Sequence, residues 1–251
     1  RERFADAIAS HRLRREIIST QLANAVINRA GAGVVARLSE ETGADAAAIA
    51  RAYVLTRDAF GLLDLNLAID GLDNALPGAA QLALYGAVQE TLVARMVWFL
   101  RNADVGRPLD EQVARFAAGV AAVSAAGGSL IANPALRQTP IDAWLERIVA
   151  LPALEAATDG VLIAEQSGAS VADGVATLFA ATDALGVGRL RQAGLGLRTT
   201  DRFERLAIDR ALERTDLALR TISVDVIRSH GGGITGLQHW QKGRAEALAQ
   251  L

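Results

Sequence analysis

The chain has 251 residues, about half of them apolar, and a formal net charge of -2. A nearly neutral charge gives no electrostatic basis for binding nucleic acid or an anionic membrane surface, so we expect neither partner. No apolar run reaches the roughly 20 residues that a membrane span needs, and the absence of cysteine excludes disulfides and thiol catalysis and fits a cytoplasmic protein.

Composition also indicates the fold class. The sequence has eleven aromatic residues, and Ala and Leu are abundant. This mixture favours close-packed helices over sheets, which need more β-branched and aromatic side chains. We therefore predict an all-α fold, an irregular multi-helix bundle of about 10–12 helices. It divides into an N-terminal half, residues 1–128, and a C-terminal half, residues 129–251, or forms one continuous helical domain.

The first predicted helix covers residues 11–28 and organises the rest of the chain. Its apolar residues recur at helical spacing and predict one buried stripe, made of Leu13, Ile17, Leu22, Ala25 and Val26. Asn is a poor helix former because its side chain competes for backbone hydrogen bonds. The amides that share a second face therefore indicate partners inside this fold or on another surface, or else a plain polar flank; they are Gln21, Asn24 and Asn28.

Local signals predict the next elements. Gly43 is placed to end a short helix over residues 34–42, and Asp45 is a good N-cap for a helix that runs to residue 60. Residues 62–76 follow as a helix that Pro77 stops. Its Asp64, Asp70 and Asp73 superficially resemble a cluster that holds magnesium, but carboxylates on an amphipathic helix are usually solvated, and we reject the metal site.

The longest helix is expected over residues 79–102. It carries an apolar stripe at three-and-four spacing, which predicts a central strut of the core or one side of a subunit interface: Leu82, Tyr85, Val88, Leu92, Met96 and Phe99. A further helix begins at Pro108 and continues to Gly127. We expect any boundary between the two halves to lie within residues 127–139.

The C-terminal half begins again with short helices. Pro140 starts one of them, and Ser170 begins a capping-box-like start for a helix that runs to residue 185. Glycines flank a short helix over residues 188–194, and Thr200 or Asp201 caps a long helix that ends near residue 229. Three glycines then form a hinge before a last amphipathic helix, which Trp240 anchors.

The sequence lacks a recognisable catalytic constellation. We expect His11, His230 and His239 to lie far apart, and they have no metal-ligand spacing. The glycine-rich stretches AAGGSL, GVG and GLG follow no predicted strand, so they do not match a dinucleotide-binding turn. There is no nucleophile elbow and no phosphate-binding loop.

Several blocks of the sequence resemble a known family. The blocks LRREIISTQLANAVINRAG, RLSEETGADAAAIARAY, AIDGLDNALP, WFLRN and HWQ resemble the C-terminal helical region of the large bacterial NAD-specific glutamate dehydrogenases. The resemblance implies that this chain is a helical segment attached to a catalytic core that lies upstream. The parent enzyme would use NAD to convert L-glutamate to 2-oxoglutarate and ammonia, and no cofactor is expected to bind here. The chain's first residue is Arg1 and it ends without a polar tail, which fits the expectation of an excised segment.

The resemblance also sets expectations for partners. This family uses lysines to orient its substrate, and Lys242 is the single lysine here, so we expect no catalysis in the segment. We expect a role in assembly, stability or regulation, through contacts with the catalytic core of the same polypeptide and within a homo-oligomer. The candidate contact residues are Arg14, Arg15, Gln21, Asn24, Asn28 and Trp240.

Two other hypotheses come from different functional classes. One is a free-standing helical binding module with an apolar ligand pocket, which Met96, Trp98 and Phe99 suggest. The other is a magnesium-dependent enzyme that uses Asp70 and its neighbouring aspartates, and this hypothesis is remote.

Overall fold

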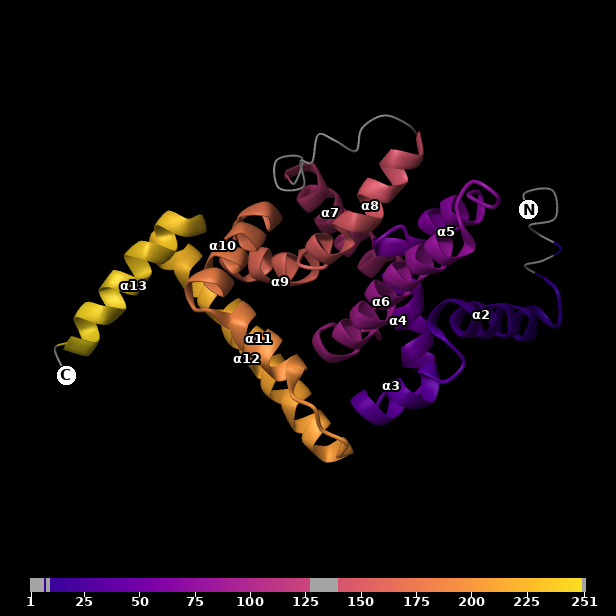
Figure 1. Cartoon of the computed structure of the whole chain (residues 1–251), viewed down its shortest axis with the longest axis horizontal. Coiled ribbons are helices and arrows are strands. Elements are labelled where there is room, and N and C mark those ends of the chain that lie inside the picture. The colour runs from indigo at the N-terminus through magenta and orange to yellow at the C-terminus, as the bar shows by residue number, and fades with distance from the viewer. Residues whose placement is uncertain (1–6, 8–9, 127–139, 250–251) are drawn as a thin grey trace. The chain divides into compact units, whose positions relative to one another are not determined.

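The computed structural model describes residue 7, residues 10–126 and residues 140–249. Twelve α-helices, α2 to α13, follow one another in these ranges (Figure 1). The described ranges contain no strand. The prediction of an all-α fold with about 10–12 helices is therefore confirmed.

The helices gather into two compact units. Unit 1 comprises Arg1–Ala117 with Pro134–Leu151, and unit 2 comprises Ala118–Asn133 with Pro152–Leu251. Residues 127–139, where we expected the boundary between halves, lie outside the described residues. The division into residues 1–128 and 129–251 stays a prediction.

Unit 1 begins with a run of short helices whose ends follow local signals. Gly43 adopts a left-handed φ of 77° after α3, and its N–H donates to the Ser39 carbonyl. Asp45 caps α4 by accepting a 2.7 Å hydrogen bond from the Ala48 N–H. Both capping predictions are confirmed. The helices of this unit are α2 (Arg14–Ala30), α3 (Val34–Thr42), α4 (Ala46–Ala59), α5 (Leu62–Asp70), α6 (Gly78–Asn102), the first part of α7 (Leu109–Ala126) and most of α8 (Pro140–Leu154).

The predicted helix over residues 62–76 is wrong in length. Helix α5 ends at Asp70, and turns occupy residues 71–76. Asn74 there adopts a positive φ of 63°, which a right-handed helix does not allow. Asp70 and Asp73 therefore do not share a helix face.

The core of unit 1 contains an aromatic cluster between α6 and α7. The Phe99 and Phe116 rings meet edge to face at 4.8 Å, and the Trp98 ring lies 5.3 Å from that of Phe99. Met96 is also fully buried. Side chains of the chain itself thus pack around the residues that suggested a ligand pocket. The predicted stripe holds from Val88 to Phe99 and fails at Leu82, which is 70% exposed.

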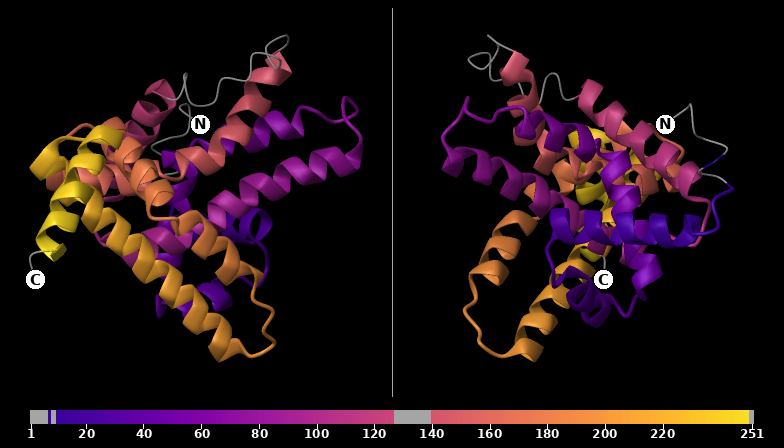
Figure 2. Two further views of the ribbon diagram at one scale, coloured as in Figure 1. Left: turned by 60° about the vertical axis from the view of Figure 1, so that its left-hand side comes forward. Right: turned by 90° about the vertical axis from the view of Figure 1, so that its right-hand side faces the viewer.

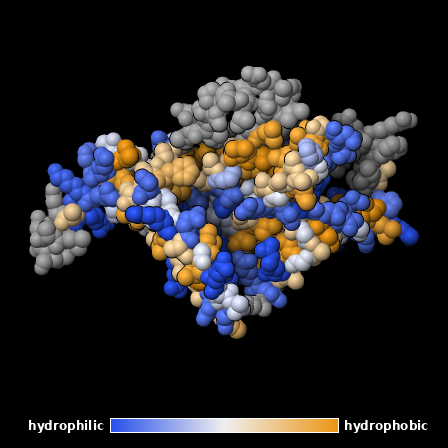
Figure 3. Space-filling model, viewed as in Figure 1, coloured by the Kyte–Doolittle hydropathy of each residue, from blue (hydrophilic) through white to orange (hydrophobic). Residues whose placement is uncertain are grey.

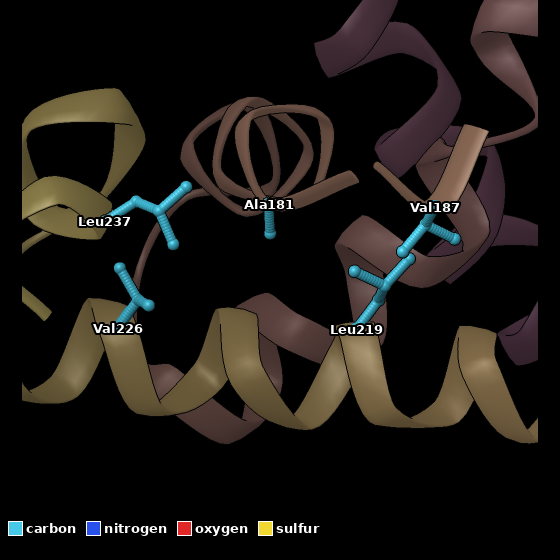
Figure 4. Packing of buried hydrophobic residues seen from close by; sticks show 5 residues of the cluster. All are labelled: Ala181, Val187, Leu219, Val226 and Leu237. Atoms are coloured by element: carbon cyan, nitrogen blue, oxygen red, sulfur yellow. The ribbon is translucent and has the colours of Figure 1, made fainter. Parts of the chain in front are cut away.

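Unit 2 is organised around α10, which packs against α9, α12 and α13. Its helices are α9 (Ala157–Ser167), α10 (Val171–Ala184), α11 (Val187–Gly196), α12 (Arg202–His230) and α13 (Gly233–Ala249), with the remaining parts of α7 and α8. In Figure 4, Val226 and Leu237 point toward one another, Val187 meets Leu219, and Ala181 lies between the two pairs. These five side chains are buried and join four helices.

The helix starts in unit 2 also follow the sequence. Ser170 accepts a hydrogen bond from the Asp173 N–H (3.1 Å) and donates one to the Asp173 carboxylate (2.7 Å), so the capping-box prediction is confirmed. Asp201, not Thr200, caps α12. The prediction that glycines flank a short helix over residues 188–194 is partly wrong, because Gly188 and Gly194 lie inside α11. Gly186 is the glycine that precedes this helix.

Glycine permits an unusually close contact between α9 and α10. A Cβ atom on Gly160 would lie 2.4 Å from Val175 Cγ2 and 3.2 Å from the Val171 carbonyl oxygen. A Cβ on Gly174 would lie 3.1 Å from the Gly160 carbonyl oxygen. Real Cβ atoms essentially never lie within 3.0 Å of such a neighbour, so a side chain on Gly160 would force Val175 to move. The two backbones therefore touch because neither residue has a side chain.

Gly160→Ala tests this contact. We expect a loss of about 1–3 kcal/mol in the free energy of unfolding, since the new methyl overlaps Val175 in a packed interior. Thermal or urea unfolding followed by circular dichroism measures the effect. Gly243→Ala in α13 is the control; its Cβ meets nothing within 4 Å, and we expect it to stabilise the helix by up to about 1 kcal/mol. The double variant G160A/V175A should recover part of the loss, and an unchanged G160A would contradict the argument.

No single helix among the described residues is long and apolar enough to cross a membrane. Helices α10 and α11 satisfy the length and composition criteria only as a pair bent by 69°.

Candidate interaction surface on helix α2

The candidate contact residues of the first helix lie on α2, whose start is held by hydrogen bonds to His11. Its N-cap, Leu13, makes no capping hydrogen bond with its side chain. The Leu13 N–H donates to His11 Nδ1 at 3.1 Å, and the Arg14 N–H donates to the His11 carbonyl at 2.9 Å. Glu16 in the first turn complements the positive end of the helix dipole.

The predicted buried stripe of this helix is wrong in its first half. Leu13 is 44% exposed and Ile17 is 49% exposed, whereas Val26 and Ala30 are buried. Leu22 and Ala25 are half-buried. The helix contacts α3, α4 and α6, and the burial pattern shows that its C-terminal half makes these contacts. The apolar residues do recur at helical spacing, but the described part of the chain buries only those in the C-terminal half of α2.

The amides and the basic residues of the prediction are all exposed. Gln21, Asn24 and Asn28 share one face of the helix, and each is exposed to solvent. These three amides therefore do not serve the core of unit 1. Arg14 and Arg15 are exposed at the other end of α2.

The first turns of α2 border an open depression of about 620 Å³. All the residues that line it come from one segment, and they include three arginines and the apolar Ile18: His11, Arg12, Arg14, Arg15, Ile18 and Ser19. Ile18 is 51% exposed. A partner here would meet positive charge beside apolar surface.

A polar network that the sequence did not reveal fixes the base of α2. Arg29 donates to the Asn66 side chain (3.1 Å) and pairs with Asp70 at 3.5 Å. Tyr85 also donates a hydrogen bond to Asp70, and this bond raises the pKa of Tyr85. Asp70, considered above as a metal ligand, therefore joins its own helix α5 to α2 and α6. The one sequence signal of this role is the position of Arg29 in the last turn of α2, next to the buried Ala30.

The remaining candidate, Trp240, lies in unit 2 and is half-buried. Its Nε1–H donates to the Asp225 carboxylate at 2.7 Å, and the Arg244 guanidinium lies 5.2 Å from its ring. Arg244 also pairs with Asp225 at 3.1 Å. The prediction that Trp240 anchors the last helix is confirmed, while its role in contacts outside this fold stays a prediction.

Two of the three histidines lie close together in the fold. His230 and His239 are not far apart, because the glycine turn after α12 brings their rings to 6.5 Å. Within the described part of the chain, however, no group of three His, Asp or Glu side chains is arranged to hold a metal ion.

One protein-family model matches the whole chain. The model described as "Glutamate dehydrogenase, C-terminal" matches residues 1–251. The chain belongs to this family.

Individual relatives agree with this assignment. The chain is 31% identical over 249 residues to an NAD-specific glutamate dehydrogenase of Pseudomonas aeruginosa, which covers 92% of this chain and 15% of that protein. It is 44% identical over 101 residues to the NAD-specific glutamate dehydrogenase of Halomonas elongata, covering 40% of this chain and 6% of that protein. The chain thus spans about a seventh of the length of the Pseudomonas relative.

The Asp225–Trp240 contact makes a prediction about pH. The hydrogen bond from Trp240, together with Arg244, lowers the pKa of Asp225 from its ordinary value. A carboxylate with a lowered pKa stabilises the folded state above the pKa of the unfolded chain, and this stability is lost as the pH falls through the folded pKa. We expect Trp240→Phe to melt at a lower temperature than wild type at pH 7. The difference between the two melting temperatures should shrink below pH ~4, because wild type then also loses the stability that the Asp225 carboxylate provides.

Melting curves from pH 7 to pH 3 measure this effect. Trp98→Phe is the control, since its ring lies in the aromatic cluster of unit 1 and its effect should not converge toward wild type at low pH. A pH-independent effect of Trp240→Phe would contradict the prediction.

Proposed function

We propose that this chain is the non-catalytic C-terminal helical segment of a large NAD-dependent glutamate dehydrogenase and serves its assembly, stability or regulation. The parent enzyme converts L-glutamate to 2-oxoglutarate and ammonia and transfers the hydride to NAD. It acts in the cytoplasm as a homo-oligomer. The family match over residues 1–251, in a chain that covers 15% of its Pseudomonas relative, supports this proposal.

The described residues do not fit a nicotinamide site. A dinucleotide fold places a glycine-rich turn between a strand and a helix, where backbone N–H groups hold the pyrophosphate. Here Gly188 and Gly194 lie within α11, which follows another helix. The stretch AAGGSL falls largely outside the described residues. We therefore assign no step of the hydride transfer to this segment.

The exposed face of α2 is the observation that carries the role in assembly. Leu13 and Ile17 are 44% and 49% exposed on the side of the helix that carries the amides of Gln21 and Asn24. Burying such an amphipathic face stabilises a complex through apolar area, while amides and arginines give it orientation. The upstream core of the same polypeptide is the partner we propose for this face.

Bulky charges on this face test the proposal in the full-length enzyme. We expect N24R/N28R to weaken the native oligomer and to lower the melting temperature of the full-length enzyme. The same substitutions should leave the melting temperature of the 251-residue chain within about 1 °C of wild type, because exposed substitutions cost little within a fold. Native mass spectrometry and differential scanning fluorimetry make the two measurements.

Ala23→Arg provides the control on the same helix. Ala23 is exposed but lies about 100° around the helix from Asn24. If N24R/N28R behaves like A23R in the full-length enzyme, the amide face has no role in assembly and the proposal fails.

A further inference from the structure

The two histidines of unit 2 meet where its last two helices join. His230 is the final residue of α12, and His239 lies on α13. Their rings lie 6.5 Å apart, centre to centre, with the ring planes inclined at 64°. Both side chains are exposed to solvent. We call His230 and His239 the histidine pair; neither side chain belongs to the buried core of the unit.

The backbone around the histidine pair is held in place by glycines. Gly231 and Gly233 adopt left-handed φ values of 77° and 76°, which let α13 begin directly after the short link at the end of α12. A Cβ atom on Gly236 would lie 1.9 Å from the Gly231 carbonyl oxygen, so the first turn of α13 touches this link. The Gly233 N–H also donates to the Thr177 hydroxyl of α10 at 2.7 Å. The link is therefore fixed to the rest of unit 2.

Contacts further along α13 hold the second histidine near the first. The side chains of Leu237 and Val226 point toward one another in the buried core. Trp240, next to His239 in the sequence, donates its 2.7 Å hydrogen bond to Asp225 of α12. Figure 2 shows the last turns of α12 meeting α13. A site whose backbone is already ordered loses little conformational entropy when a ligand binds.

The separation of the two rings is within reach of one shared metal ion. Where two imidazoles bind one Zn²⁺ ion at about 2.0–2.1 Å, the ring centres lie about 5 Å apart. The histidine pair reaches this separation if its rings approach by about 1.5 Å. Rotation about the side-chain bonds supplies this movement, because both residues are exposed and no neighbour encloses them.

The electrostatic surroundings of the pair are mixed, with a negative contribution from α12. His230 lies at the C-terminal end of that helix, which is the negative end of the helix dipole. The Asp225 carboxylate interacts electrostatically with His230, although it also pairs with Arg244. Lys242 lies three residues after His239 and opposes a cation, but its exposed side chain is flexible enough to turn away. The surface in view over α13 is largely hydrophilic, so an ion reaches it from water (Figure 3).

We propose that the histidine pair binds one divalent transition-metal ion, such as Zn²⁺, between α12 and α13. Imidazole nitrogens suit Zn²⁺, Ni²⁺ and Cu²⁺, whereas Mg²⁺ and Ca²⁺ take oxygen ligands. The chain supplies two ligands, because the described residues contain no group of three His, Asp or Glu that could hold an ion. Water fills the remaining positions. The ion is therefore exchangeable, unlike that of a structural zinc site with four protein ligands.

The bound ion would tie the last helix to the end of α12. Its role is a reversible clip on α13, and it does not depend on the assembly role proposed for α2. The two proposals involve different units of the chain, so either can fail while the other stands.

Calorimetric titration of the untagged 251-residue chain with Zn²⁺ tests this site. We expect one ion per chain for wild type. H230Q and H239Q should each weaken the binding at least tenfold, since either change leaves a single imidazole. The double variant H230Q/H239Q should bind no more weakly than either single variant, because the loss of one ligand already destroys a shared site. Mg²⁺ in place of Zn²⁺ should give no binding.

His11 provides the matched control, because it is the third histidine of the chain and lies in unit 1. H11Q should bind Zn²⁺ as wild type does. Circular dichroism checks that each variant keeps its helices, which we expect because exposed substitutions cost little. Hydrogen exchange gives a second readout: Zn²⁺ should slow exchange at the amides of α13 in wild type and leave that of H239Q unchanged.

Three results would overturn the proposal. They are a wild-type chain that binds no Zn²⁺ at millimolar concentration, an H11Q variant that loses as much affinity as H230Q, and a double variant whose loss of binding free energy equals the sum of the two single losses. The last result would mean that the two histidines bind separate ions.

Discussion

The packing of unit 2 depends on backbone contact between α9 and α10 at Gly160 and Gly174. This contact brings Val175 and Ile163 into the interior and fixes the surface on which α12 and α13 lie. The buried Arg220 then pairs with Asp159 of α9 at 3.6 Å. A buried ion pair of this kind adds little net stability, but removal of one partner leaves a costly unpaired charge. It thus specifies where along α12 the packed part begins.

That starting point explains why the first half of α12 is left uncovered. Helix α12 has 29 residues, or about 43 Å at 1.5 Å per residue, and the neighbouring helices of unit 2 cover only its second half. Exposed apolar side chains are common on folded proteins, but several of them gathered on one face favour burial against a partner. The first half of α2 has the same character in unit 1. Each unit therefore presents one helix that is anchored at its C-terminal half and uncovered at its N-terminal half.

The sequence predicted what is decided locally. Helix ends at Asp45, Ser170 and Asp201 depend on a side chain and the N–H groups two or three residues away, so a short stretch contains all the information. The close approach at Gly160 was not predictable in this way, because it depends on which helix lies opposite. The prediction of a buried stripe along the whole of α2 failed for a related reason. Periodicity shows that a face seeks cover but not whether the same chain supplies it.

The same distinction applies to the candidate site. Gln21, Asn24 and Asn28 were identified because amides in a helix are locally unfavourable, and local cost is visible in sequence. The network of Arg29, Asn66, Asp70 and Tyr85 was missed, since its members come from three helices and each is unremarkable alone.

A segment without catalytic groups can still control an enzyme, provided that its contacts differ between two states of the core. The coupling free energy equals the difference in contact free energy between those states, and values of about 1–3 kcal/mol change an affinity about 5–150-fold. An amphipathic face such as that of α2 can supply such a difference, because a small rotation exchanges amide contacts for water. The polar network at Arg29 ties the base of α2 to α5 and α6, so a force on the exposed half of α2 would reach both of these helices. Contacts of the exposed half of α2 would then be energetically linked to the packing of α5 and α6 within unit 1.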